Sequence, residues 1–193
     1  MNITHKHIED VFEYDGSQIN PLWAFREFGI YGSSIVTWIG PVNIVPENLK
    51  DFADVGLEIK SGNMVNVICE FFDQQPPNIR LAYLRQRLLV MIFREVLGEY
   101  GVVSAREGDD VYVSGRKLSI SIASVSLSSA KIHFALNIRD EGTPDDVDTI
   151  GLFDIGDVFN EDNLEDLIFD VVNRFVLELE NIENDISKTK VLL

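Results

Sequence analysis

The chain has 193 residues and a mass of 21.8 kDa, and 46% of its residues are hydrophobic while 25% are charged. This length supports one sizeable hydrophobic core but not two ordinary domains, so we expect a single globular domain over residues 1–193. Thirty-two acidic and sixteen basic side chains give a net charge of −16, which repels nucleic acids and anionic membranes at long range. We therefore expect neither nucleic acid nor membrane among its partners.

The cysteine content and the apolar runs point to a cellular location. Because Cys69 is the one cysteine, the chain cannot form an intramolecular disulfide or a multi-cysteine metal site. The longest apolar runs, such as residues 88–93, are far shorter than the roughly 20 residues that cross a bilayer. Residues 1–10 are polar and have no apolar signal core. These features predict a cytoplasmic protein.

The N-terminal part of the chain alternates between expected strands and short helices. The expected strands are rich in β-branched and aromatic residues and cover residues 3–14, 34–39, 57–60 and 64–72. Segments that begin near a proline and carry apolar residues at helical spacing predict short helices over 21–28 and 46–55. Ser61-Gly62-Asn63 is expected to interrupt the last two strands.

The clearest helix is expected over residues 79–100. Its apolar residues recur at steps of three and four and predict one buried stripe, made of Leu81, Leu84, Leu88, Ile92 and Val96. At 100° per residue, Arg85 falls inside this stripe. After Gly101 the apolar period changes to two, which predicts an antiparallel meander that ends near Ile138.

The C-terminal segment predicts an acidic amphipathic helix at about 161–187. Its expected inner face consists of Leu164, Leu167, Ile168, Val171, Phe175, Leu179, Ile182 and Ile186. Taken with the preceding elements, this pattern predicts an α+β fold with a mixed, mostly antiparallel sheet and helices packed largely on one side.

The segment 108–119 holds the main candidate for a functional residue. It places Lys117 just beyond a tight turn, at the start of a strand and after Asp109 and Asp110. An ammonium in that position could meet a phosphate or an acyl carbonyl, and Asp110 could polarise it or hold a cation. An exposed hairpin with solvated charges explains the same pattern, so the residues alone leave both interpretations open.

Three further residues have side chains that can take chemical roles. Arg85 on an apolar helix face must pair with a structural carboxylate or bind a carboxylate or phosphate of a ligand. His133 lies on a strand between Ile132 and Phe134, where it is either a hydrogen-bonded structural residue or an acid–base group. Cys69 is expected to be a buried small hydrophobe, and no metal site is expected.

Two kinds of motif resemble known families. The turn Asp109-Asp110 with Gly115-Arg116-Lys117, and the strand 131–138 ending in Leu136-Asn137-Ile138, resemble the biotin and lipoate protein ligase superfamily, whose fold is similar to class II aminoacyl-tRNA synthetases. The phrases Tyr14-Asp15-Gly16-Ser17-Gln18 and residues 81–89 resemble the uncharacterised, largely archaeal domain-of-unknown-function family 366.

The resemblance assigns roles to several residues. It implies that Lys117 holds an acyl-adenylate, which makes ATP or an acyl-adenylate the candidate cofactor. It also implies that Lys60, Ser61 and Gly62 form a shortened phosphate loop, while Asn137 lines the cleft. Two departures stand out: Ile120 replaces a glycine that ligases have three positions after the lysine, and residues 149–156 lack the cysteine of octanoyl transferases.

Together these features predict a protein that binds a small carboxylate- or acyl-bearing ligand in a cleft over the sheet, with acyl or adenylyl transfer as its enzymatic form. Lys117 is the first candidate residue, with Arg85 assisting. The alternative is a scaffold, interaction module or homodimer that has lost the ligase active site. A metal-dependent hydrolase that uses Asp15, Asp109 and Asp110 is a third, weaker reading.

Overall fold

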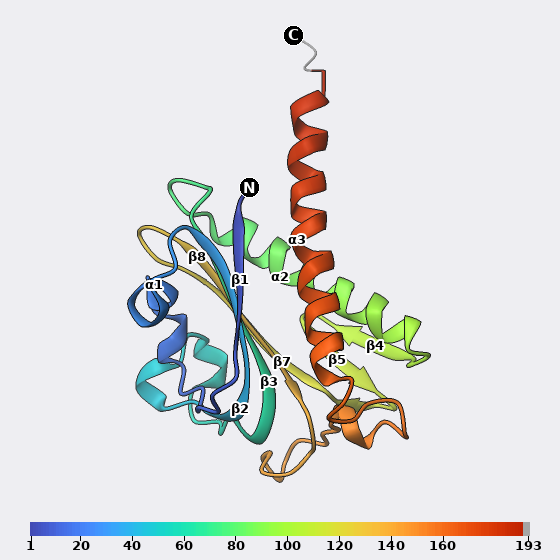
Figure 1. Cartoon of the computed structure of the whole chain (residues 1–193). Helices are drawn as coiled ribbons and strands as arrows, with labels where there is room; N and C mark the ends of the chain where they lie inside the picture. The colour runs from blue at the N-terminus through green and yellow to red at the C-terminus, as the bar shows by residue number, and fades with distance from the viewer. Residues whose placement is uncertain (191–193) are drawn as a thin grey trace.

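The computed structural model describes residues 1–190, which form a five-stranded sheet, a three-stranded sheet and three α-helices (Figure 1). The strands are β1 (Ile3–Ile8), β2 (Ser33–Asn43), β3 (Lys60–Phe71), β4 (Ser104–Glu107), β5 (Asp110–Val113), β6 (Arg116–Lys117), β7 (Ser119–Val125) and β8 (Ala130–Asn137). The α-helices are α1 (Trp23–Phe28), α2 (Ile79–Glu99) and α3 (Leu164–Lys188). Short 3-10 helices are η1 (Ser17–Ile19), η2 (Pro46–Asn48), η3 (Phe52–Asp54) and η4 (Leu152–Asp154).

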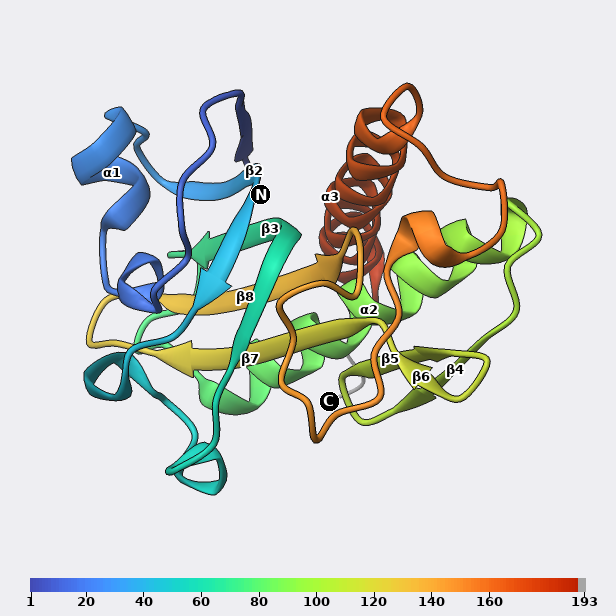
Figure 2. The ribbon, with the colours of Figure 1, turned by 90° about the horizontal axis from the view of Figure 1, so that it is seen from below.

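The five-stranded sheet has the order β1-β2-β3-β8-β7. Only the β1–β2 pair in it is parallel, and the other neighbours are antiparallel. The small sheet has the order β4-β5-β6 and lies beside α2 (Figure 2). This arrangement confirms the predicted α+β class with a mixed, mostly antiparallel sheet.

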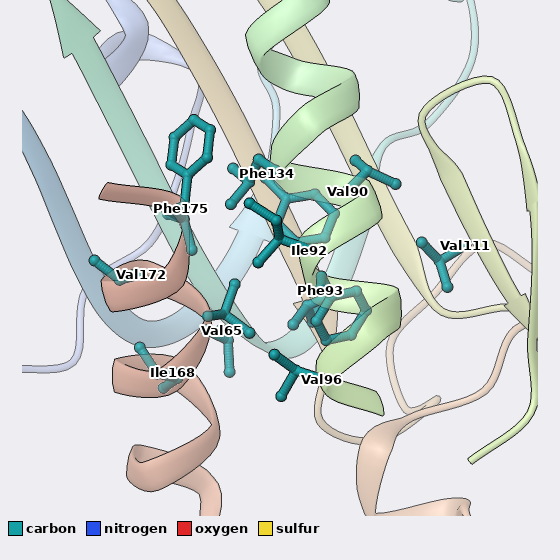
Figure 3. Close-up of a cluster of buried hydrophobic side chains, with 14 of the residues drawn as sticks. Val65, Val90, Ile92, Phe93, Val96, Val111, Phe134, Ile168, Val172 and Phe175 are labelled. Atoms are coloured by element: carbon teal, nitrogen blue, oxygen red, sulfur yellow. The ribbon is translucent and has the colours of Figure 1, made fainter. Parts of the chain in front are cut away.

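One face of the five-stranded sheet is covered by the two long helices. Alternate residues of β3 and β8 point to this side and form the main core with α2 and α3 (Figure 3). The aromatic members pack edge to face, with ring centroids 5.5 Å apart for Phe93 and Phe134 and 6.3 Å apart for Phe71 and Phe175. Each aromatic pair of this kind contributes about 0.5 to 1.5 kcal/mol beyond the effect of the apolar area that it buries.

The opposite face of the sheet is covered only in part. Here η1 and α1 pack against β2 through a smaller cluster that contains Trp23 and Trp38. The residues of β3 and β8 with the other parity, which include Met64, His133 and Asn137, point to this side. The part of this face that η1 and α1 do not cover lines a cavity.

Two helical expectations need correction. Residues 46–55 form no α-helix but only η2 and η3, because their apolar side chains find no core: Phe52 is 94% exposed and Val55 66%. A short helix without an apolar partner surface is marginal in water. The predicted stripe of α2 is confirmed at Ile92 and Val96, but Leu84 is 61% exposed and Leu81 and Leu88 are only half-buried. The other buried residues of the helix are Ala82, Arg85, Gln86, Leu89, Val90, Phe93 and Leu97.

The strand boundaries differ in several places, since β2 extends to Asn43 and residues 57–59 form no strand. β1 ends at Ile8 rather than near residue 14. Residues 61–63 do not interrupt a strand but belong to β3, which pairs with β2 across an irregularity between Gly40 and Val42. The expected meander is divided between two sheets, because β5 and β6 pair with β4 and not with β7.

The C-terminal helix begins and ends close to its expected bounds. Its inner face is buried from Leu164 to Leu179, as predicted. Ile182 and Ile186 are 39% and 63% exposed instead, because α3 extends past the edge of the sheet (Figure 1). In the part of the chain that the structure describes, no helix has the length and apolarity needed to cross a membrane.

Gly40 illustrates how closely the segments pack. A Cβ atom at this position would collide with the Phe12 carbonyl, which accepts a hydrogen bond of 3.0 Å from Trp38 Nε1. We therefore expect Gly40→Ala to lower the free energy of unfolding by about 2 kcal/mol. The matched control is Gly98→Ala in α2, where a Cβ meets nothing and the better helix former should add about 0.5 to 1 kcal/mol. Urea denaturation of the two variants tests this, and equal stabilities would contradict it.

Candidate functional site

A cavity of about 320 Å³ lies on the face of the five-stranded sheet opposite α2 and α3. Its floor contains buried side chains from β3 and β8, together with Tyr14. One wall comes from residues 44–60, which connect β2 with β3, and the other from residues 143–149. The fold therefore builds the cavity from sheet residues of one parity and from two connecting segments.

Lys117 reaches this cavity from the β5–β6 hairpin. Ser114 and Gly115 form the two-residue turn of this hairpin and both have positive φ, as such tight turns require. The Lys117 backbone is fixed on both sides, because its N–H donates to the Asp148 carbonyl at 2.9 Å and its carbonyl accepts from the Ile150 N–H at 3.0 Å. The ammonium group lines the cavity with its side chain 26% exposed.

The ammonium of Lys117 is already paired. Its Nζ lies 2.8 Å from Asp110 Oδ2. Burial raises the pKa of the Asp110 carboxyl, although the hydrogen bond with Lys117 acts in the opposite direction. Desolvation and neighbouring Asp51 also raise the pKa of Asp54. The mouth of the cavity is therefore a crowded acidic environment in which each added negative charge is unfavourable.

The charged side chains of the lining are mostly acidic. Three of them are lysines, Lys50, Lys60 and Lys117, and six are carboxylates: Asp51, Asp54, Glu58, Asp109, Asp110 and Asp146. Lys60 pairs with Glu58 at 2.6 Å. Asp109 is held by two groups of α2, since it accepts a hydrogen bond of 2.7 Å from Gln86 Nε2 and pairs with Arg87 at 2.6 Å. A ligand that enters must be compatible with this negative balance.

The segment proposed as a phosphate loop has another structure. Lys60 and Ser61 line the cavity, but Gly62 does not. The Gly62 N–H donates to the Glu141 carbonyl at 2.9 Å, and a Cβ on Gly62 would lie 2.8 Å from the same oxygen. Residues 60–63 therefore form the start of β3 against the neighbouring connector, and their amides do not form an open cradle for a phosphate.

Asn137 and Ser61 connect the two sides of the cavity floor. The Ser61 hydroxyl donates to Asn137 Oδ1 at 3.1 Å. The Asn137 amide nitrogen lies 3.4 Å from the Ile150 carbonyl and 3.5 Å from that of Lys117. Asn137 thus lines the cavity and also supports the backbone that carries the lysine.

His133 is almost completely buried at the floor of the cavity. Its ring stacks on the ring of Tyr14 with centroids 3.6 Å apart and an interplanar angle of 17°. His133 Nε2 lies 3.1 Å from Asn66 Oδ1. Burial lowers the pKa of His133 to about 3, so the imidazole is neutral at physiological pH. A neutral histidine in this position accepts or donates hydrogen bonds but carries no charge.

Arg85 lies outside the cavity. Its guanidinium forms a two-pronged ion pair with Asp73, with Nη1 2.8 Å from Oδ1 and Nη2 2.5 Å from Oδ2, and stacks over Phe71. This hydrogen-bonded pair lowers the pKa of the Asp73 carboxyl. Of the two roles that the sequence left open for Arg85, the structure has the salt bridge with a carboxylate of the protein. Because Arg85 lies outside the cavity, it is not placed to assist Lys117.

This ion pair gives a testable result. Asp73→Asn leaves Arg85, whose side chain is only 7% exposed, without a counter-charge and should lower the free energy of unfolding by about 2 kcal/mol; the loss is moderated because the Asp73 side chain is 26% exposed. The matched control is Asp185→Asn in the exposed pair with Lys188, where we expect a change below about 0.5 kcal/mol. Chemical denaturation measures both, and similar losses would contradict the structural role of Arg85.

Tyr14 is a buried cavity residue that was not among the candidates from the sequence. The phrase Tyr14-Asp15-Gly16-Ser17-Gln18 indicated only a family resemblance, and in the structure it contains a turn in which the Ser17 N–H donates to Asp15 Oδ1 at 2.8 Å. Tyr14 itself is only 1% exposed and forms an isolated bridge with Val42. An aromatic residue directly before a turn was the only signal, and it does not reveal the side on which the ring lies.

The other candidates occupy separate places. Cys69 is fully buried on β3, where desolvation raises the pKa of its thiol. Asp15 does not line the cavity with Asp109 and Asp110. Over residues 1–190, no group of three or more histidine, cysteine or acidic side chains is arranged to hold a metal ion. The structure thus does not assemble the three carboxylates of the hydrolase alternative.

The fold is similar to that of biotin and lipoate protein ligases. One similar structure is a biotin protein ligase from Aquifex aeolicus in complex with biotin and ATP. The structural alignment covers 96% of this chain and 73% of the ligase chain, with a TM-score of 0.59 and 14% sequence identity. At this identity the similarity establishes the fold alone.

Closer matches identify the family. The model of the domain of unknown function DUF366 matches residues 3–190, and the chain belongs to this family. An uncharacterised protein from Methanocaldococcus jannaschii is 36% identical over 192 residues, which cover 96% of this chain and 84% of the relative. A solved protein of unknown function from Pyrococcus horikoshi is 40% identical over the whole of both chains, with a TM-score of 0.91. The predicted resemblance to this family and to the ligase fold is confirmed.

Proposed function

We propose that this protein binds a small carboxylate- or acyl-bearing molecule in the 320 Å³ cavity, with the ligand's carbonyl or carboxylate end at Lys117. The observation that carries the proposal is the position of Lys117, whose side chain is half-buried at the cavity and whose backbone is held by hydrogen bonds on both sides. A partly desolvated cation on a fixed backbone favours oxygen atoms that carry negative or partial negative charge.

The charge balance of the lining refines this proposal. Because Asp110 already occupies Lys117, an entering carboxylate competes with a carboxylate of the protein. An acyl carbonyl adds no net charge and can accept a hydrogen bond from Lys117 without displacing Asp110. Acyl transfer is the enzymatic form of the proposal. We attach no ATP-dependent step to it, since residues 60–63 are part of a strand.

The direct test is equilibrium binding to purified protein. Octanoate, lipoate, biotin, ATP and an acyl-adenylate analogue are titrated by calorimetry against the wild type, Lys117→Ala and Lys188→Ala. We expect at least one acyl-bearing compound to bind, and Lys117→Ala to weaken its binding about tenfold, as the loss of a charge-assisted hydrogen bond implies. Lys188 lies on the exposed end of α3, and its removal should change nothing.

A second function is favoured by the ion pairs at the mouth. Lys60 and Lys117 both have carboxylate partners in the structure, as expected for a surface that no longer needs them for a ligand. In that case the protein is a scaffold or interaction module. No binding at millimolar concentration for any compound, or unchanged binding to Lys117→Ala, would overturn ligand binding at Lys117 and favour this alternative.

A further inference from the structure

The floor of the cavity carries two polar atoms without partners in the protein. Tyr14 and His133 are each 1% exposed and both line the cavity. Neither the Tyr14 hydroxyl nor His133 Nδ1 makes a hydrogen bond to any residue from 1 to 190, although His133 Nε2 does. Within these residues the one fully enclosed side-chain nitrogen or oxygen without a partner is Arg85 Nε, so the two floor atoms keep access to the cavity.

The hydrogen-bond character of His133 Nδ1 follows from its neighbours. The Asn66 amide nitrogen donates to the carbonyls of Gly40 at 3.2 Å and Met64 at 3.3 Å. Asn66 Oδ1 is therefore an acceptor, and His133 Nε2 must carry the proton that it receives. In the neutral ring, Nδ1 is then a free acceptor. The hydroxyl of Tyr14, on the ring that stacks against His133, is a free donor.

A buried donor and acceptor of this kind have consequences for the ligand. A polar group that loses water without gaining a partner is costly, so an apolar ligand end on this floor would be disfavoured. A charged end would be disfavoured as well, because both floor groups are neutral and the charged side chains of the lining are exposed or half-buried. The complementary ligand end is neutral and has both an acceptor and a donor.

The stacking of the two rings further limits which chemical groups fit as the buried end of the ligand. Their centroids lie 3.6 Å apart in nearly parallel planes, so the donor and the acceptor belong to different layers. A ligand group with two adjacent polar atoms, one an acceptor and the other a donor, matches such a pair. We propose that Tyr14 and His133 bind the buried end of the ligand and select a carboxamide-type group, whose oxygen accepts from the Tyr14 hydroxyl and whose N–H donates to His133 Nδ1. This inference rests on the proposed function, which places the ligand's other end at Lys117.

The test compares two acids that differ only at the far end. Suberamic acid ends in a carboxamide and nonanoic acid in an apolar group of similar size. Calorimetry with the wild type should give suberamic acid at least a tenfold lower dissociation constant, because a site built for hydrogen bonds discriminates against a ligand that lacks them. Tyr14→Phe retains the stacked ring and removes only the donor, so it should weaken suberamic acid about tenfold and leave nonanoic acid within twofold.

The controls separate the two proposals. Tyr31→Phe removes the hydroxyl of a tyrosine that is 81% exposed and should change neither affinity. Lys117→Ala should weaken both acids. Equal affinities with this dependence on Lys117 would overturn the selection of a carboxamide and leave ligand binding at Lys117 intact. Failure of both acids to bind at millimolar concentration would overturn the inference together with the binding of such acids at Lys117.

Nitrogen-15 NMR of the imidazole provides a readout that does not depend on a variant. In the free protein the His133 signals should be those of a neutral ring protonated at Nε2. Suberamic acid should shift the Nδ1 resonance toward the position of a hydrogen-bonded acceptor, and nonanoic acid should not. A proton on Nδ1 in the free protein, or an unchanged Nδ1 resonance in the complex with suberamic acid, would contradict the proposal.

Discussion

Acidification from pH 7 to pH 4 is expected to destabilise the protein by about 3 kcal/mol through His133 alone. Burial holds the pKa of this histidine at about 3 in the folded state, while the ordinary value of 6.5 applies in the unfolded chain. Between these values the unfolded state binds more protons, so stability falls as the pH falls below about 6.5. The loss continues until the pH approaches 3.

The variant His133→Gln isolates this contribution. Its amide cannot be protonated in this range, so the difference in unfolding free energy between pH 7 and pH 4 should be about 3 kcal/mol smaller than in the wild type. His5, whose pKa is lowered to about 4 by burial and by His7, acts in the same direction in both proteins and cancels in the comparison. Urea denaturation at pH 7, 6, 5 and 4 gives the values. Parallel pH profiles would contradict the buried neutral state of His133.

Phe175→Ala is expected to lower the free energy of unfolding by about 3 to 5 kcal/mol at neutral pH. Phe175 is fully buried on α3 and packs edge to face on Phe71 of β3, so its removal leaves a cavity between the helix and the sheet (Figure 3). The surrounding strands and α2 are closely packed, so a local shift fills this space only in part.

Leu177→Ala on the same helix is the matched control. Leu177 is 57% exposed, so its truncation should change the stability by less than about 0.5 kcal/mol. Denaturation at neutral pH gives both values, and a circular dichroism spectrum shows whether α3 persists. A loss below about 1 kcal/mol for Phe175→Ala would mean that α3 is not an integral part of this core.

Some features of the fold could be predicted because they depend on local periodicity. The long helices α2 and α3 have apolar spacings that indicate their bounds within about three residues. Residues 46–55 show the limit of this reasoning, since their spacing is helical but the tertiary structure offers them no apolar surface. Their Leu49 instead lines the cavity wall, a role that periodicity cannot distinguish from helix packing.

The candidate site was predictable where residues are close in the sequence. Asp110 and Lys117 belong to one hairpin, so the turn at Ser114-Gly115 already places them on neighbouring strands. Arg85 could be assigned a partner of opposite charge but not the partner's identity. Tyr14 and His133 are far apart in the sequence. Their contact depends on how β8 packs against the N-terminal segment, which the sequence pattern does not indicate.

The location of bound ligand tests the central claim most directly. Two-dimensional nitrogen-15 spectra of the protein, recorded during titration with an acyl-bearing compound, report each backbone amide. We expect the shifts to concentrate on the cavity lining, at Lys117, in β7 and β8, and in residues 44–60 and 143–149. Shifts confined to another surface, or none at millimolar ligand, would contradict a ligand site at Lys117.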